Sequence, residues 1–238
     1  MKKMYIITCL LLVAFSIQAQ EQTQEQKEDQ VSFDLGADLV SSYVWRGAYQ
    51  TSASVQASMG LSIAGFSLSA WGSVPFSGIA KEVDFTIGYE VAGFSVAITD
   101  YWWAGEDAYK YFTYDARQTE HHFEGSLSYS LPVEKFPLAL SWNTLFAGED
   151  YYKADGKRAY SSYVTAAYPF KIKSTGLEAE IGITPWKGMY ADGFTVVSVG
   201  IKARKEIRIT DGFSLPVFGQ VLANPKSQDV FFVFGLSL

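Results

Sequence analysis

The chain has 238 residues, of which 48% are hydrophobic, 16% aromatic and only 18% charged, and its formal net charge is −6. That length suits one domain or at most a small pair of domains. The low and acidic charge argues against a nucleic-acid-binding protein, which needs a basic surface to neutralise phosphates.

The first 19 residues predict a secretory signal peptide. Two lysines precede the apolar run Met4–Phe15, and Ala19 offers a small residue for cleavage. The run is too short for a transmembrane helix, which needs roughly 20 apolar residues. Cys9 is the only cysteine and lies inside this run, so we expect a mature chain without disulfides or cysteine-ligated zinc. Residues 20–30 are polar and predict a disordered lead-in.

From residue 31 onward, apolar residues alternate with small or polar ones, which is the period of a β-strand. In the first run, Val31–Trp45, one face carries apolar side chains up to Tyr43 and Trp45, and the other carries Ser, Gly, Asp and Arg. The alternation predicts twelve strands, at 31–45, 53–63, 66–73, 83–91, 94–103, 119–131, 136–147, 160–170, 177–184, 194–207, 213–222 and 230–238.

The predicted connections alternate between short and long. Ala64-Gly65 and Ala92-Gly93 have the composition of tight turns, whereas residues 104–118 and 148–158 form long polar loops. Short turns at one rim and long loops at the other are typical of outer-membrane barrels, and a soluble β-sandwich, the alternative, has no reason to sort its loops in this way. We therefore predict an all-β fold, a transmembrane antiparallel β-barrel of about twelve strands over residues 31–238.

One segment carries a family resemblance. Residues 36–47 (GADLVSSYVWRG) are followed by Gln50-Thr51, by Trp71-Gly72-Ser73 and by an acid at Glu82 that precedes Gly88-Tyr89. These motifs resemble the opening strands of the TorF-like family of porins, over about residues 36–100. The resemblance implies an outer-membrane barrel with a transport role. The chain departs from that pattern at its end, because it finishes on Leu238 rather than on an aromatic residue.

The polar face of the predicted strands carries more acids than bases. The acids are Asp34, Asp38, Asp84, Glu90, Glu124, Glu178 and Glu180, and the bases are Arg46, Lys202 and Arg204. A water-filled lumen with this lining favours cations. The alternative is that the charges pair across strands and plug the interior. For Arg46, at the end of the first predicted strand, the two interpretations are a constriction that contacts anionic solutes and a salt bridge to a neighbouring acid.

Two further patterns bear on chemistry. His122, Glu124 and Ser126 share the polar face, with Ser141 and Asn143 opposite, which are the residue types of outer-membrane hydrolases. Because this cluster points into the lumen rather than toward lipid, we do not expect an enzyme.

A loop motif occurs twice, at Ala104–Lys110 and Ala147–Lys153, with paired acids that either hold a divalent cation beside lipid phosphates or remain solvated. Pro216, inside the eleventh predicted strand, predicts a bulge.

The sequence thus favours a porin-like channel of the outer membrane that lets small solutes diffuse passively, with no catalytic residue, metal or cofactor. An outer-membrane lipid or ester hydrolase and a plugged structural or surface-recognition barrel are the alternatives. The expected partners are outer-membrane lipid and lipopolysaccharide, the barrel-assembly machinery and small solutes, with no nucleic acid among them.

Overall fold

Extended strands dominate the computed structural model, which describes residues 31–106, 110–115, 117–133 and 136–238. Residues 31–238 form one compact unit. The predicted signal peptide (1–19) and the predicted lead-in (20–30) lie outside the described residues. Within those described ranges, no helix has the length and apolar character needed to cross a membrane.

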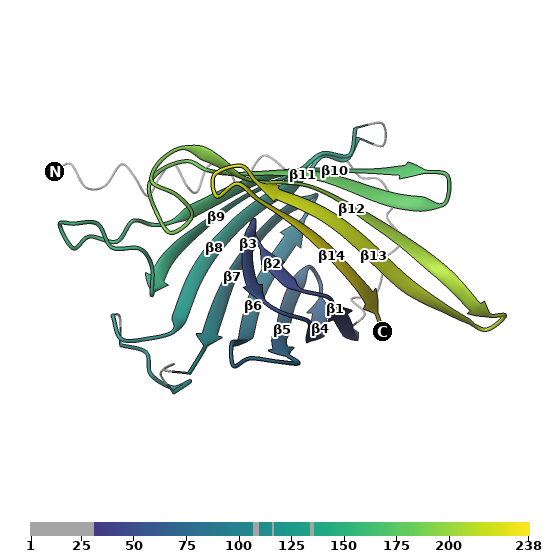
Figure 1. Cartoon of the computed structure of the whole chain (residues 1–238), viewed down its shortest axis with the longest axis horizontal. Helices are drawn as coiled ribbons and strands as arrows, with labels where there is room; N and C mark the ends of the chain where they lie inside the picture. The colour runs from purple at the N-terminus through teal and green to yellow at the C-terminus, as the bar shows by residue number, and fades with distance from the viewer. Residues whose placement is uncertain (1–30, 107–109, 116, 134–135) are drawn as a thin grey trace, which may run out of the picture. The chain divides into compact units, whose positions relative to one another are not determined.

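Twelve antiparallel strands of the described chain close into a barrel (Figure 1). They are β1 (Ser32–Val40), β4 (Ser54–Ile63), β5 (Phe66–Pro75), β6 (Lys81–Val91), β7 (Phe94–Ala104), β8 (His121–Ser130), β9 (Ala139–Gly148), β10 (Ser162–Ile172), β11 (Thr175–Thr184), β12 (Thr195–Thr210), β13 (Phe213–Asn224) and β14 (Asp229–Ser237). From β4 to β14 each strand pairs with its neighbours in the chain, and β1 closes the ring by pairing with both β4 and β14. The predicted all-β fold and the closed barrel of twelve strands are confirmed.

The apolar side chains of the barrel point outward. On β4, Met59 and Leu61 keep 52% and 44% of their surface exposed, whereas Ser54 on the opposite face is fully buried. The same alternation recurs along the other strands, where Leu68, Ile87 and many similar residues are exposed. An apolar outer wall around a polar interior is the reverse of a soluble protein and fits a barrel surrounded by lipid.

The two rims differ as the sequence predicts. At one rim the strands are joined by tight turns except between β8 and β9, where the connection is residues 131–138. In Ala64-Gly65 and Ala92-Gly93 both residues have positive φ angles, which is the type I′ geometry of two-residue hairpins. Glycine is required at the second position of the first turn, since a Cβ at Gly65 would lie 2.5 Å from the carbonyl oxygen of Glu90. The longer connections, including residues 149–161 and 185–194, lie at the opposite rim.

The first strand is shorter than predicted. It ends at Val40, and the next residues form a separate two-stranded sheet of β2 (Tyr43–Trp45) and β3 (Ala48–Thr51). Arg46 and Gly47 connect these two short strands with positive φ angles of 49° and 77°. The prediction that Tyr43 and Trp45 continue the outer face of the first strand is therefore wrong, because the chain folds back at the rim instead of extending the barrel wall.

The β2–β3 hairpin lies inside the barrel (Figure 1) and contacts opposite walls. On one side the ring of Trp45 packs against Trp103 of β7, with centroids 5.4 Å apart. On the other side the amide of Asn224 on β13 donates a hydrogen bond of 3.0 Å to the carbonyl oxygen of Gly47. Because β7 and β13 lie far apart around the ring, a hairpin that touches both must cross the lumen.

Pro216 is accommodated differently from the prediction. It pairs opposite Glu206 without a register shift, and the irregularity between β12 and β13 lies between Arg208 and Thr210. Pairing of β13 with β14 begins only at Val217, so Pro216 lies where β13 has no partner on that side. A proline, which lacks the N–H donor, is tolerated at such an edge. The expectation of a bulge at Pro216 is wrong for this reason.

The contact of Gly47 with the far wall can be tested by substitution. A Cβ at position 47 would lie 2.0 Å from the carbonyl oxygen of Val197, so Gly47→Ala should undock the hairpin and leave the barrel closed. Backbone amides of β2 and β3 should then exchange hydrogen at least about tenfold faster. The matched control is Gly78→Ala, because Gly78 also has a positive φ but a Cβ there meets nothing within 4 Å. Equal exchange in the two variants would contradict a docked hairpin.

Candidate functional site

The turn of the hairpin is held to the barrel wall by a buried ion pair. Both terminal nitrogens of the Arg46 guanidinium contact the carboxylate of Glu124 on β8, at 2.6 Å and 2.8 Å. The side chain of Arg46 is only 10% exposed and that of Glu124 is fully buried. A two-point contact of this kind fixes both the position and the orientation of the guanidinium.

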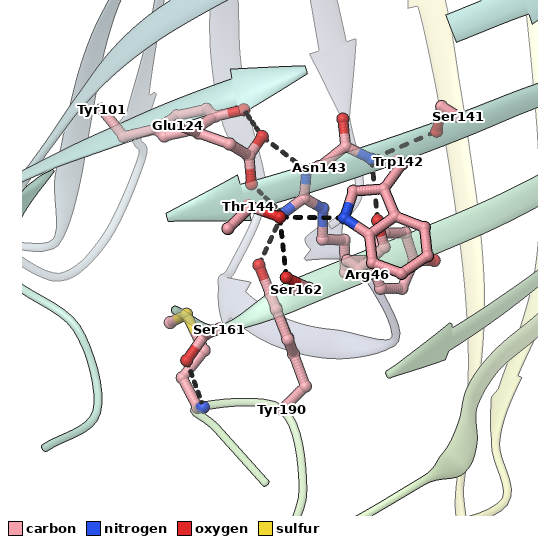
Figure 2. Close-up of polar contacts among 12 residues, drawn as sticks. Arg46, Tyr101, Glu124, Ser141, Trp142, Asn143, Thr144, Ser161, Ser162 and Tyr190 are labelled. Atoms are coloured by element: carbon pink, nitrogen blue, oxygen red, sulfur yellow. Dashed lines mark hydrogen bonds and ion pairs between the residues drawn. The ribbon is translucent and has the colours of Figure 1, made fainter. Parts of the chain in front are cut away.

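Other side chains complete the environment of this pair, as Figure 2 shows. The hydroxyl of Tyr101 on β7 donates to Glu124 at 3.0 Å, and Arg46 donates to the hydroxyl of Tyr190. The guanidinium also lies over the rings of Trp45 and Tyr163, 4.3 Å and 4.8 Å from their centroids. Arg46 is thus enclosed by aromatic rings and a carboxylate, and the hairpin is anchored at its tip.

A second segment of the long-loop rim also folds inward. Tyr190 belongs to the loop 185–194 between β11 and β12, and its ring lies 5.6 Å from that of Tyr163 on β10. The loop is held near β10 because the backbone N–H of Met189 donates to the hydroxyl of Ser161 at 2.8 Å (Figure 2). The hairpin and this loop both occupy the lumen at the level of Arg46, and a cavity remains beside them.

Cavities lie along the interior of the described barrel, and three of them bear on the predicted lumen residues. One of about 270 Å³ opens at the long-loop side, between the hairpin and strands β5 to β7, and one of about 140 Å³ lies beside Arg46. Gln50 and Trp103 line both of these cavities. A third, of about 570 Å³, lies toward the tight turns and is lined by Asp38, Lys202 and Arg204 among others.

The structure brings only some of the predicted lumen residues together. Arg46 and Glu124 form the anchor, and Lys202 and Arg204 lie on β12 opposite β11, where Arg204 reaches within 3.9 Å of Glu178. The remaining predicted residues lie on the inner faces of strands β1, β6 and β11: Asp34, Asp38, Asp84, Glu90 and Glu180. Of these, Glu180 accepts a hydrogen bond of 3.4 Å from Tyr163, whose ring lies under the guanidinium of Arg46. Asp84 is buried, whereas Asp34 and Glu90 are exposed.

Glu82, Trp103 and Tyr190 are lumen residues that the sequence analysis did not place among its lumen candidates, although it names Glu82 in the family motif. Glu82 is two residues before Asp84 on β6, so the strand period places it inward once the strand is known to start at Lys81. Its burial could have been predicted from the alternation. Tyr190 lies in a loop, where no periodicity indicates which way a side chain points.

The His122, Glu124 and Ser126 cluster does not form a catalytic arrangement in this geometry. Glu124 accepts hydrogen bonds from Arg46 and Tyr101, while the Nδ1 atom of His122 lies 3.2 Å from the carbonyl oxygen of Glu120. Among the described residues, no hydrogen bond links His122 to Glu124 or Ser126. The carboxylate that a hydrolase would use to orient its histidine is engaged in the hairpin anchor instead.

The second histidine lies on the outer wall. His121 Nδ1 is 2.7 Å from a carboxylate oxygen of Asp100, and its Nε2 contacts the carbonyl oxygen of Tyr111. Tyr114 stacks on the imidazole ring with centroids 4.3 Å apart. Nε2 and the stacked ring therefore hold residues 110–115 against the barrel wall, Nδ1 is taken up by Asp100 of β7, and neither nitrogen faces a nucleophilic hydroxyl.

The repeated acidic loops are described only in part, because residues 107–109 of the first copy lie outside the described residues. In the second copy, Asp150 is buried and accepts hydrogen bonds from the backbone N–H groups of Tyr151 and Ser161. Burial raises the pKa of the neighbouring Glu149 carboxyl. No group of three or more metal-ligating side chains occurs in the described part of the chain. In the second loop, Asp150 thus stabilises the conformation of the loop itself.

No protein-family model matches the chain, and a search of curated proteins gives no significant match. The resemblance to the TorF-like porins therefore remains a prediction from the motifs quoted above.

The anchor makes a quantitative prediction. Glu124→Ala should lower the free energy of unfolding by about 3–5 kcal/mol, because it leaves the guanidinium of Arg46 buried without its partner. The double variant Arg46→Ala/Glu124→Ala should be less destabilised than Glu124→Ala alone. Urea unfolding of protein refolded in detergent micelles measures both. Glu90→Ala, on an exposed part of the inner wall, is the control, and a Glu124→Ala variant as stable as this control would refute the assigned role.

Proposed function

We propose that this protein is an outer-membrane β-barrel that conducts small solutes through a channel narrowed by the β2–β3 hairpin. The apolar outer wall supports the membrane location, since exposed apolar side chains on every part of the ring need a lipid environment. Tight turns at one rim and longer loops at the other are the layout of outer-membrane barrels.

The observation that carries the channel proposal is the hairpin anchored across a polar lumen by Arg46 and Glu124. Twelve strands enclose more space than their own side chains fill, and an inserted segment reduces this space to a narrow passage. The hairpin is joined to the wall through one ion pair, a few aromatic contacts and the Asn224 hydrogen bond, rather than through continuous strand pairing. Such an attachment can open without disturbing the barrel.

The lining supports a preference for cations. Asp34, Asp38 and Glu90 lie on the inner wall, and Asp34 and Glu90 are exposed there. Lys202 and Arg204, the bases toward the tight turns, lie opposite or near acids of β11, and Glu178 partly offsets the charge of Arg204. The field along the passage therefore favours positive ions.

Removal of the hairpin tests the channel directly. Val40 and Ser54 are paired residues of β1 and β4, so deletion of residues 43–51 leaves Ser41-Ser42-Ser52-Ala53 as a four-residue turn between two paired strands. We expect this variant to show larger single-channel conductance steps in planar bilayers than the intact protein, and a cation preference that Asp38→Lys reduces.

The control is removal of residues 154–156 from the loop between β9 and β10, which should leave the conductance unchanged. A hairpin-deleted barrel that refolds, as judged by heat-modifiable migration in electrophoresis, and shows no conductance would refute the channel. It would favour instead a plugged barrel with a structural or recognition role.

A further inference from the structure

The cavity at the long-loop side has the features of a binding site. Its volume is about 270 Å³, and its walls come from two parts of the chain. The hairpin contributes Tyr43, Gln50 and Thr51, and the barrel wall contributes Ser73, Glu82 and Trp103. The exposed Lys81 and the half-buried Glu120 also belong to the lining. Because two independent elements form the walls, the site exists only while the hairpin is docked.

Two of the residues that line this cavity carry buried polar atoms without hydrogen-bond partners. Glu82 is only 6% exposed and Ser73 only 1%, yet neither Oε1 of Glu82 nor Oγ of Ser73 has a hydrogen-bond partner among the described residues. Buried polar groups in proteins are nearly always hydrogen-bonded, and an unpartnered carboxylate oxygen carries the larger penalty. A cavity lined by such atoms points to a ligand that supplies the missing contacts.

A second buried carboxyl group lies beside Glu82. Asp84 lies two residues after Glu82 on the inner face of β6, is 8% exposed, and its Oδ1 also lacks a partner among the described residues. Within the same residues, neither carboxyl group forms an ion pair with a basic side chain, and the guanidinium of Arg46 is paired with Glu124. A cation that enters from solvent supplies the opposite charge that this pair of carboxyl groups lacks.

The walls indicate which kind of cation fits. The rings of Tyr43 and Trp103 line the cavity, and aromatic faces attract organic ammonium groups while burying the carbon atoms attached to them. Acceptor oxygens on Glu82 and Ser73 match the N–H donors of a primary ammonium group. A bare metal ion is less suited, because the described residues contain no group of three or more metal-ligating side chains.

We propose that this cavity binds a small organic cation with a primary ammonium group, which lies against Glu82 and Ser73 while its carbon skeleton packs on Tyr43 and Trp103. The idea that such a cation is also a solute of the channel rests on the proposed function. Binding of the cation in the cavity does not depend on the channel, since binding is measured without any current.

Isothermal titration calorimetry with protein refolded in detergent tests the site, with benzylammonium as the probe. We expect saturable binding, at least about tenfold weaker binding of the uncharged benzyl alcohol, and at least about tenfold weaker binding of benzylammonium to Glu82→Gln. The matched control is Glu90→Gln, which removes a carboxylate from the same face of β6 near the tight turns and should leave the affinity unchanged.

Two further variants guard against a folding defect. Ser73→Ala should weaken binding without removing a charge, and Gly47→Ala should weaken it by releasing the hairpin walls while Glu82 remains in place. Absence of benzylammonium binding to the intact protein, equal binding of benzyl alcohol, or undiminished binding to Glu82→Gln in a refolded barrel would overturn the inference. If the protein conducts ions in planar bilayers but does not bind benzylammonium, only the proposed binding site is overturned. If it binds benzylammonium but conducts no ions, only the proposed channel is overturned.

Discussion

A closed sheet with its apolar side chains on the outside has to fill or hydrate a polar interior, and the rest of this structure follows from that constraint. Closure gives every strand of the ring a hydrogen-bonded neighbour on each side, and internal pairing of backbone groups is the condition for crossing a lipid bilayer with strands. The side chains that would form the core of a soluble protein, such as Leu68 and Ile87, instead remain exposed. The interior is left to polar side chains and to the segments that fold into it.

The hairpin of β2 and β3 meets this constraint with a mixture of aromatic and charged contacts. Arg46 brings a positive charge into an interior rich in carboxylates, and Glu124 and the surrounding rings compensate for the loss of its hydration. The hairpin thereby divides the lumen between a cavity at the long-loop side and a larger cavity toward the tight turns. This division underlies both the proposed passage and the proposed ammonium site.

The architecture of the barrel could be predicted from the sequence because strand alternation is a local signal. Residues such as Met59 and Ser54 show in their order alone which face each occupies, and turns such as Ala64-Gly65 mark where the chain reverses. Because the alternation recurs in each of twelve segments, the number of strands could be predicted correctly. The seven acids and two of the three bases predicted for the inner wall, on β1, β6, β8, β11 and β12, follow from the same period.

The hairpin could not be predicted, because its sequence continues the alternation of the first strand. Tyr43 and Trp45 keep the period of two after Val40, so nothing local distinguishes a strand that extends from one that folds back. The difference lies in contacts with residues remote in sequence, such as Glu124 and Asn224. Long-range contacts of this kind also account for Tyr190, whose loop position carries no periodic signal.

Quenching of tryptophan fluorescence by brominated lipid tests the central claim that the apolar face meets lipid while the hairpin lies inside. The comparison uses two variants refolded into liposomes, one keeping only Trp142, which is 43% exposed on the outer face of β9, and one keeping only Trp45 of the hairpin. The structure predicts strong quenching of Trp142 and little quenching of Trp45. Equal quenching of both residues would place Trp45 on the outer wall. If neither residue were quenched, the outer face of the barrel would not contact lipid, and the membrane location would be wrong.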